Sequence, residues 1–458
     1  MSWASGESSE TSISLDYRLL RNGVEIYSSN STFSYLAIKK LPFKDLIRFF
    51  YVDTPPQASY TYSLQARIRS FSNIQATTQV LETDMSTIVF DNVSSSSNLY
   101  VTYRPEDNLG NGYVAVVNTS TNSVIDTIEV GRGAGAIAIS PDGGTVYVVN
   151  SLDNTVSLID TYSNLVVATL SVGANPSAVV VAADNTKTYV ANYDSNSVTV
   201  IDNIKREKIT TVPVGSGHPF AMVASPKSWF VFVATKEDQE GHIGAVYGIS
   251  IKDEQVTGAN NIYDFSTLPE RNPLAVSPDS RTLLVFEKNN IYVYLISEAV
   301  INWPGYGNVS WPGWVSGDFL NSPDNYFYAV QDPSSVLLGK AILRADDMSY
   351  AGPWYLPSHR GQYQLAFTPD LSKVCVTIIG DDDQFPGLQI IETGNNDAPH
   401  FVEVPVAFKL AITPDSTKAY VTEHQYVHPV NLLTYTAENA VLIGKNVESL
   451  VSAYTLRS

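Results

Sequence analysis

Basic side chains recur just ahead of several apolar segments of this chain. The five that could act together are Arg132, His218, Arg271, His359 and Arg360. Arginine can bind a carboxylate or a phosphate through two parallel hydrogen bonds, and histidine can act as a base or an acid near neutral pH. If the fold gathers these residues, they predict a binding site for an anionic ligand. The alternative is that they are polar loop ends that contact only solvent.

A second set of side chains is acidic and lies in a different group of loops. Its members are Glu106, Asp107, Asp153, Asp194, Glu237, Asp238 and Asp381–Asp383. An acidic rim around a basic ring would focus the electric field into the space that the ring encloses. The three consecutive aspartates lack the glycine and glutamate spacing of an EF-hand loop, so a solvated acidic loop is the simpler interpretation than a calcium site.

Tryptophans cluster in one part of the chain, at Trp303, Trp311 and Trp314. If exposed, these rings could stack on sugars or form an interaction patch for a protein partner, since aromatic residues are enriched at interfaces. If buried, they would fill the interior of an unusually wide repeat. The sequence leaves both interpretations open.

The familiar linear motifs of catalysis and metal binding are missing from the sequence. There is no G-x-S-x-G and no H-E-x-x-H. Cys375 is the single cysteine, which excludes an intramolecular disulfide and a cysteine-based metal site. The glycine-rich stretch Gly131–Gly135 is not followed by a helical pattern, as a phosphate-binding loop requires. We therefore expect no catalytic residue, no metal and no cofactor.

The elements that must position these residues are repeated along the chain. An apolar run leads into a turn that usually reads Ser/Thr-Pro-Asp, and a second apolar strand follows. The turns are marked by Asp142, Asp184, Lys227, Asp279, Asp324, Asp370 and Asp415. Proline presets φ in such a turn, and aspartate accepts hydrogen bonds from the nearby backbone. Two further short strands complete each repeat, and four strands in about 40–45 residues is the period of a β-propeller blade.

Two of the second strands, Tyr147–Asn150 and Tyr189–Asn192, have the form Tyr-Val-x-Asn. Together with the SPDG turn and the fourth strand VIDTIEVG, they resemble the YVTN family of β-propeller repeats. The resemblance is close over residues 99–215 and weaker over 216–458, where the Pro-Asp turn persists but the Tyr-Val-x-Asn signature fades. It implies an all-β propeller, a fold whose lactonase-like members use a similar turn.

The number of blades depends on how the two ends of the repeat region are interpreted. Asn98–Gly131 contains only the second to fourth strands of a repeat, and Glu448–Leu456 is a lone first strand. If these two pieces share one sheet, the propeller is eight-bladed and closed, which removes exposed sheet edges. A seven-bladed ring is the alternative, if Ser86–Phe90 serves the first blade or one degenerate repeat is not a blade.

The remaining N-terminal part follows a different pattern. We expect a flexible arm over 1–12, a β-sandwich or jelly-roll domain over 13–92, a serine-rich linker over 93–98, and the propeller over 99–458, closed by strand 448–456. Asn22-Gly23 between two alternating segments predicts a hairpin. The segments YRLLRNG and YVDTPP resemble small β-domains of spore-surface, exosporium-type proteins of spore-forming bacteria. That resemblance implies a cell-surface, spore-surface or extracellular location.

Composition restricts the possible partners. Lys and Arg number 28 against 46 Asp and Glu, a net charge of −18, which argues against nucleic acid as a partner. No apolar run approaches the roughly 18 residues of a transmembrane helix. The first residues also lack the positive and apolar segments of a secretory signal.

These observations predict a non-enzymatic surface or structural protein. The N-terminal domain would anchor the protein or assemble it into a homo-oligomer, and the propeller would bind a protein partner, another copy, or surface carbohydrate. We favour this interpretation over an enzyme because the sequence contains none of the linear catalytic motifs named above. Two alternatives stay open: a lactonase-like propeller hydrolase with its site at the mouth of the channel, and a carbohydrate-binding adhesin that uses the tryptophans.

Overall fold

The computed structural model divides the chain into two compact units, Met1–Ser95 with Leu456–Ser458, and Ser96–Thr455. The residues that it describes are 11–21, 24–34, 62–73, 76–79, 86–90, 97–105, 110–236, 244–263, 272–277, 280–287, 290–297, 307–310, 315–319, 326–331, 340–344, 350–354, 362–370, 372–378, 385–392, 400–405 and 408–454. The described part of the chain contains no helix long and apolar enough to span a membrane.

The described residues of the first unit form one antiparallel sheet in the order β2-β1-β3-β4, with β5 also paired to β3. The strands are β1 (Thr11–Arg21), β2 (Val24–Ser34), β3 (Tyr62–Asn73), β4 (Ala76–Gln79) and β5 (Ser86–Phe90). Arg21 pairs directly with Val24, so the hairpin predicted at Asn22-Gly23 is confirmed. A second sheet, which the predicted sandwich or jelly roll requires, is not among the described strands.

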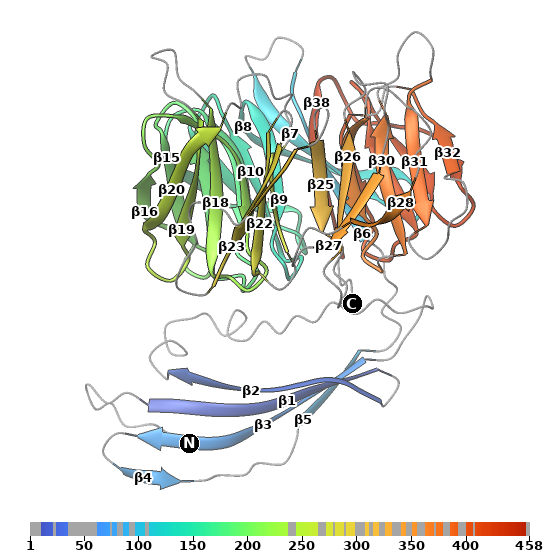
Figure 1. The fold of residues 1–458 in the computed structure, drawn as a ribbon. Helices are drawn as coiled ribbons and strands as arrows, with labels where there is room; N and C mark the ends of the chain where they lie inside the picture. The colour runs from blue at the N-terminus through green and yellow to red at the C-terminus, as the bar shows by residue number, and fades with distance from the viewer. Residues whose placement is uncertain are drawn as a thin grey trace. The chain divides into compact units, whose positions relative to one another are not determined.

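The second unit consists of four-stranded antiparallel sheets, each with its strands in the order first to fourth (Figure 1). Eight such sheets lie within the described residues; sheet 1 is β38-β6-β7-β8, and sheets 2 to 8 follow in chain order. The first strands are β38 (Val447–Tyr454), β9 (Ala134–Ile139), β13 (Pro176–Val181), β17 (His218–Ala224), β21 (Leu274–Val276), β25 (Val315–Phe319), β29 (Gln362–Phe367) and β33 (Leu410–Ile412). The second strands are β6 (Ser97–Tyr103), β10 (Thr145–Asn150), β14 (Lys187–Asn192), β18 (Phe230–Lys236), β22 (Thr282–Glu287), β26 (Tyr326–Gln331), β30 (Lys373–Ile378) and β34 (Lys418–Thr422).

The two outer positions of each sheet complete the pattern. The third strands are β7 (Asn111–Asn118), β11 (Thr155–Asp160), β15 (Ser197–Asp202), β19 (Gly244–Ser250), β23 (Asn290–Leu295), β27 (Lys340–Arg344), β31 (Gly387–Glu392) and β35 (Tyr426–Asn431). The fourth strands are β8 (Ser123–Arg132), β12 (Leu165–Ser171), β16 (Glu207–Pro213), β20 (Val256–Tyr263), β24 (Gly307–Ser310), β28 (Tyr350–Trp354), β32 (His400–Glu403) and β36 (Thr436–Ala437), while β37 (Val441–Leu442) also pairs with β35.

Burial follows the position of a strand in its sheet. The second strand β10 is buried at every residue, because neighbouring sheets cover both of its faces. The fourth strand β12 instead alternates between exposed and partly exposed residues. The continuous apolar runs of the sequence are therefore second and third strands, and the alternating runs are outer strands.

The predicted Ser/Thr-Pro-Asp turns are confirmed where the structure describes them. The carboxylate of Asp142 accepts a hydrogen bond from the amide of Gly144 at 3.0 Å, and Asp415 accepts one from Thr417 at 3.1 Å. The residue after the turn aspartate has a positive φ, and Gly143 meets this demand without strain. In sheet 5 the same position is Ser280, whose hydroxyl accepts a 2.8 Å hydrogen bond from the amide of Lys227 in sheet 4. This turn therefore also links neighbouring sheets.

The first strands form the inner edge of the unit. Each contacts the first strand of the following sheet, in the order β38, β9, β13, β17, β21, β25, β29, β33 and back to β38. Their carbonyl groups on the open side have no further strand to pair with, so neighbouring side chains bind them. Thr102 donates to the carbonyl of Gly135 at 2.8 Å, and Ser177 donates to that of Pro219 at 2.8 Å. These bonds satisfy backbone groups that would otherwise be unpaired sheet edges.

Sheet 1 joins distant parts of the chain. Its inner strand β38 pairs antiparallel with β6, so that Tyr454 lies opposite Ser97 and Leu450 opposite Val101. The side chains of Leu99, Val101 and Leu450 are buried in one hydrophobic cluster with Tyr420 of sheet 8. The last described strand thus pairs with the edge of β6 that β7, its neighbour along the chain, leaves open.

The repeated tyrosine of the second strand connects one sheet to the next. The hydroxyl of Tyr100 in sheet 1 donates to Asn164 in sheet 2 at 3.1 Å, and Tyr420 in sheet 8 donates to Asn122 in sheet 1 at 2.6 Å. Both tyrosines are fully buried. At these two positions the second-strand tyrosine therefore links neighbouring sheets, whereas the hydroxyl of Tyr189, in a Tyr-Val-x-Asn segment, has no partner among the described residues.

Ionic contacts reinforce the junction of sheets 8 and 1. Lys418 donates to Glu438 at 2.8 Å and to the carbonyl of Thr119 at 3.0 Å, while Asn122 also donates to Glu438. Burial alone would raise the pKa of Glu438, but the hydrogen bonds from Lys418 and Asn122 and the charge of Lys418 outweigh it. The pKa of this carboxyl is consequently lowered from its usual value.

Replacing Glu438→Gln should reduce the stability at neutral pH by about 1 kcal/mol, since a partly exposed ion pair is worth little more. A carboxyl whose pKa is lower in the folded state stabilises the protein above the unfolded pKa and loses this contribution as the pH falls through the folded pKa. Urea unfolding at neutral and at acidic pH should therefore show the two proteins converging in acid. The control Glu207→Gln changes a carboxyl on an exposed residue and should leave the curve unchanged; a difference that stays constant with pH would contradict the assignment.

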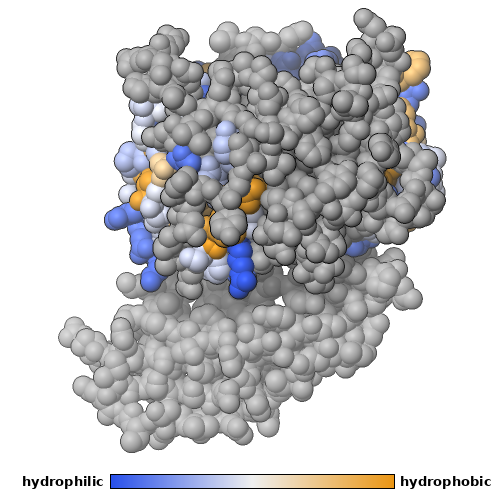
Figure 2. Space-filling view, in the orientation of Figure 1, coloured by the Kyte–Doolittle hydropathy of each residue, from blue (hydrophilic) through white to orange (hydrophobic). Residues whose placement is uncertain are grey.

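Each described outer strand of sheets 1 to 3 contains a bulge at an equivalent place. The bulged residues are Ile125, Val167 and Ile209, which stand between paired neighbours. Bulges twist an edge strand and make it a poorer template for another strand. On the face in Figure 2 the coloured residues mix hydrophilic and hydrophobic side chains, and the hydrophobic ones form small patches.

Candidate active site

The ends of the inner strands where the chain enters them lie together on one face of the second unit. Arg104, which follows β6, binds the beginnings of both β38 and β9, and the hydroxyl of Ser177 in β13 reaches Pro219 in β17. We call this region the mouth. Polar residues at these ends include Arg104, Arg132, Tyr193, His218, Lys236 and Glu448.

Arg132, one of the five predicted basic residues, points to an acidic partner. Its guanidinium Nε lies 2.7 Å from Asp153, and its backbone amide donates to the same carboxylate at 2.7 Å. The backbone hydrogen bond, then the side-chain bond and the charge of Arg132, lower the pKa of Asp153 although burial opposes them. Arg132 and Asp153 therefore form an ion pair with each other. They do not belong to separate basic and acidic sets.

Arg104 is a mouth residue that the sequence analysis did not single out. Its Nε donates to the carbonyl of Ala134 at 2.9 Å, and a terminal nitrogen lies 2.9 Å from the carboxylate of Glu448. Nothing in its sequence context distinguishes it, because the partners belong to the far end of the chain and to the next repeat. Its role here is to join sheets 1 and 2.

His218 is held in a defined orientation and protonation form. Its Nδ1 lies 2.8 Å from the backbone carbonyl of Tyr193, and the two rings stack with centroids 4.4 Å apart and planes 6° apart. A carbonyl can only accept, so Nδ1 carries the hydrogen, and in the neutral ring Nε2 keeps its lone pair. The residue is only partly buried, and Nε2 has the lone pair that a base requires.

Lys236 lies beside His218, because the two residues pair across β17 and β18. Its ammonium group lies 4.8 Å from the ring centre of Phe220, and it has no carboxylate partner among the residues that the structure describes. Arg104 and Arg132, by contrast, each have a described carboxylate partner, Glu448 and Asp153. His218 and Lys236 therefore occupy paired backbone positions of sheet 4, with the imidazole against Tyr193 and the ammonium group over Phe220.

Several predicted residues lie outside the described part of the chain. They are Arg271, His359, Arg360, Trp303, Trp311, Trp314, Glu106, Asp107, Glu237, Asp238 and Asp381–Asp383. Of the five basic residues the structure describes Arg132 and His218, and they lie in different sheets, Arg132 beside Asp153 and His218 against Tyr193. Their gathering into one basic site stays a prediction, as does the tryptophan patch. Among the described residues no group of three or more His, Cys, Asp or Glu could hold a metal ion.

Cys375 is not available for nucleophilic chemistry. Its side chain is fully buried in sheet 7 among Leu388, Ile390 and Val402. Burial raises the pKa of the thiol to about 12, so the reactive thiolate is not formed near neutral pH.

Comparison with known proteins agrees with this architecture. A family model described as a YNCE-like beta-propeller matches residues 105–257. The chain folds as a β-propeller. No curated protein sequence matches it.

Solved structures show the same propeller fold at low sequence identity. The dihydro-heme d1 dehydrogenase NirN, in complex with DHE, aligns with a TM-score of 0.60 and 15% identity over 77% of this chain and 74% of that one. Apo AztD from Citrobacter koseri aligns with a TM-score of 0.58 and 15% identity, over 80% of this chain and 100% of AztD. A candidate 6-phosphogluconolactonase from Bacteroides fragilis aligns with a TM-score of 0.50 and 14% identity, over 78% of this chain and 98% of that protein.

These neighbours correct one prediction. The interpretation as a non-enzymatic surface or structural protein is wrong, because the fold is shared with a dehydrogenase and a candidate lactonase. The error came from treating the missing linear motifs as a sign that no chemistry takes place. A propeller assembles its site from single residues of separate repeats, so such a site leaves no contiguous motif.

Proposed function

We propose that this protein is a ligand-handling propeller enzyme whose mouth hydrolyses a small cyclic ester. The observation that carries the proposal is the Nδ1-protonated His218, which leaves Nε2 as a base at a backbone position paired with that of Lys236. The fold that the chain shares with a candidate 6-phosphogluconolactonase supports a lactone as the substrate class.

The two residues would have separate roles in the reaction. Nε2 of His218 takes a proton from water as the water oxygen attacks the carbonyl carbon of the ester. Lys236 stabilises the negative charge that develops on the carbonyl oxygen, or binds an anionic substituent of the substrate. The ring C–O bond then breaks and the leaving oxygen receives the proton, so that water and lactone give a hydroxy acid.

Comparison between repeats indicates that the fold does not require either residue. The register aligns Pro219 of sheet 4 with Pro176 of sheet 3, which places Asn175 where His218 stands and Tyr193 where Lys236 stands. Sheet 3 forms the corresponding strands β13 and β14 one residue shorter, with Asn175 and Tyr193 just outside them. Substitutions at His218 and Lys236 should therefore test chemistry rather than folding.

The variant His218→Asn should lower the rate of lactone hydrolysis about 100-fold or more, since a positioned general base contributes at least that factor. Asparagine matches the residue of the preceding repeat and keeps a donor near the Tyr193 carbonyl, but it is not a base. A pH-stat assay with glucono-δ-lactone and 6-phosphoglucono-δ-lactone as substrates measures the effect.

The matched control is His400→Asn, which makes the same change at an exposed residue of the outer strand β32, where the ring stacks on Tyr435. This control should hydrolyse both lactones at the wild-type rate. No hydrolysis of either lactone by the wild-type protein, or equal rates in His218→Asn, would refute the proposal.

We also propose that the propeller has eight blades closed by the C-terminal strand. The order of contacts among the eight inner strands supports this count, as does the pairing of β38 with β6. Closure in this way would place the mouth at the end of a central channel, with His218 at its rim.

A further inference from the structure

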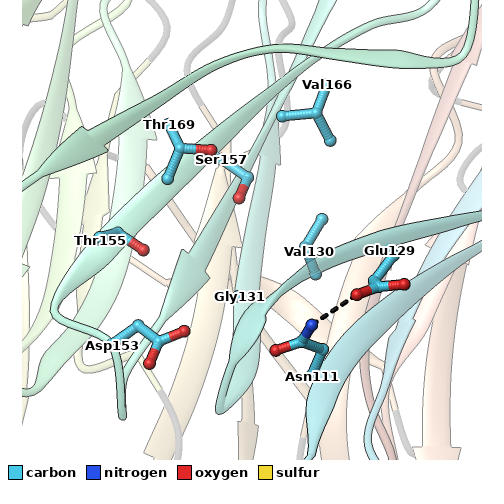
Figure 3. Close-up of a pocket in the computed structure, with 9 residues that line it drawn as sticks. All are labelled: Asn111, Glu129, Val130, Gly131, Asp153, Thr155, Ser157, Val166 and Thr169. Carbon is cyan, nitrogen blue, oxygen red and sulfur yellow. Dashed lines mark hydrogen bonds between the residues drawn. The ribbon is translucent and has the colours of Figure 1, made fainter.

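A groove between sheets 1 and 2, separate from the mouth base His218, forms a polar cavity of about 460 Å³. It is lined by Asn111, Glu129, Val130, Gly131, Asp153, Thr155, Ser157, Val166 and Thr169 (Figure 3). In Figure 3 Asn111, Glu129 and Asp153 lie toward one end, and Val166 and Thr169 lie toward the other. The volume is in the usual range of about 300–1,000 Å³ for small-molecule sites and far exceeds the space of one ion.

Behind the lining residues Gly131, Thr155 and Ser157 lies an amide that is only half satisfied. Asn150 is fully buried and its Nδ2 donates to Thr155 at 3.0 Å and to Ser157 at 2.9 Å. Its Oδ1 has no hydrogen-bond partner among the described residues. A methyl group added to Gly131 would lie 2.8 Å from the Asn150 amide, so glycine is what lets the groove wall approach it.

The next groove around the ring shows which of these features the fold needs. Asn192 is the counterpart of Asn150 and donates to Ser197 and Thr199 in the same way, but its Oδ1 accepts the amide of Gly173 at 2.9 Å. Asp153 has Ser195 as its counterpart. Asp153 accepts a hydrogen bond from the amide of Arg132, and Ser195 accepts one from the amide of Ala174; each amide follows the glycine, Gly131 or Gly173, of its own repeat.

The register of the outer strands places Ser171 at the position of Glu129. Serine therefore suffices for the fold at both acidic positions. The two carboxylates, and the unpartnered oxygen of the buried Asn150 amide behind the wall, distinguish the first groove from the next one.

The hydrogen-bonding groups of the groove suit a ligand that both donates and accepts. The carboxylates of Glu129 and Asp153 accept; Glu129 already has one donor, from Asn111, and Asp153 has two, the amide and the Nε of Arg132. The oxygens of Thr155 and Ser157 accept from Asn150, so their hydroxyl hydrogens remain for other acceptors. The negative charge of the two carboxylates disfavours the binding of an anion. An ammonium ion only donates hydrogen bonds, so it would leave the hydroxyl donors of Thr155 and Ser157 unused. We propose that this groove binds a mono- or disaccharide through its hydroxyl groups, with Val130 and Val166 against its C–H faces.

Saturation-transfer NMR on the full chain tests the proposal, with D-glucose, D-galactose, N-acetyl-D-glucosamine and cellobiose at millimolar concentration as probes. At least one of these should receive saturation from the protein. The double variant Glu129→Ser with Asp153→Ser, which installs the residues of the next groove, should weaken that binding about tenfold or more, since hydrogen bonds to charged groups are lost.

Two further variants separate binding from folding. Thr169→Val keeps the volume of a lining side chain and should weaken saccharide binding, whereas Ser171→Ala in the next groove should leave it unchanged. Absence of saturation transfer to all four probes would overturn the proposal. So would unchanged binding in the double variant, or binding of spermidine in the groove when no saccharide binds. Because the readout is binding, the lactone assay on His218 neither supports nor weakens this inference.

Discussion

Removal of residues 447–458 should leave a protein that does not reach the native state under conditions where the full chain is folded. The deletion takes away β38, which pairs with β6 along seven residue pairs and covers Leu99 and Val101. It exposes both a row of unpaired backbone groups and a buried apolar face, a loss comparable with the whole stability of about 5–15 kcal/mol of a typical domain. Thermal unfolding followed by near-ultraviolet circular dichroism, with light scattering for the mass, measures the result.

The control for this truncation removes only residues 455–458, which leaves every described pair of β38 in place. That shorter deletion should unfold at the temperature of the full chain. A monomer of the longer deletion that unfolds at the wild-type temperature would refute closure by β38. Larger assemblies of the longer deletion would agree with it, because the exposed edge of β6 would pair with other copies.

Phe232→Ala should lower the free energy of unfolding by about 3–5 kcal/mol, the cost of removing a buried aromatic ring and leaving a cavity. The ring is fully buried between sheets 4 and 5, where Leu274, Leu283 and Val285 belong to the same cluster. Urea denaturation gives the change directly.

The matched control is Tyr162→Ala, which removes an aromatic ring that is 72% exposed in a turn of sheet 2. Its effect should stay within about 0.5 kcal/mol, as for most surface substitutions. If Phe232→Ala cost no more than this control, the two sheets would not be packed as described.

Local features of the fold were predictable because each depends on a few neighbouring residues. The turn at Asp142 and the hairpin at Asn22-Gly23 follow from backbone preferences that act over four residues. The four-stranded repeat follows from the alternation and length of apolar runs between such turns. The tyrosine of the second strand could be recognised as a signature, but its bond from Tyr100 to Asn164 in the next sheet could not.

The candidate site was predictable only in part, because its contacts cross between repeats. His218 stood out by its residue type, whereas its orientation depends on the carbonyl of Tyr193 in another sheet. Lys236 was missed because a lysine at the end of a strand is ordinary, and only its pairing with His218 gives it a role. Arg132 was predicted to face a ligand, and no pattern along the chain indicated its bond to Asp153.

The direct pairing of Ser97 with Tyr454 has a mechanical consequence. These residues are the first and last of the two strands, so tension between the segments before 97 and after 454 acts at one end of an antiparallel ladder. Such a pull peels the ladder one bond at a time, which needs less force than shearing all its bonds together. Stretching the molecule from its two ends would therefore unzip β38 from β6 before any other sheet of the ring gave way.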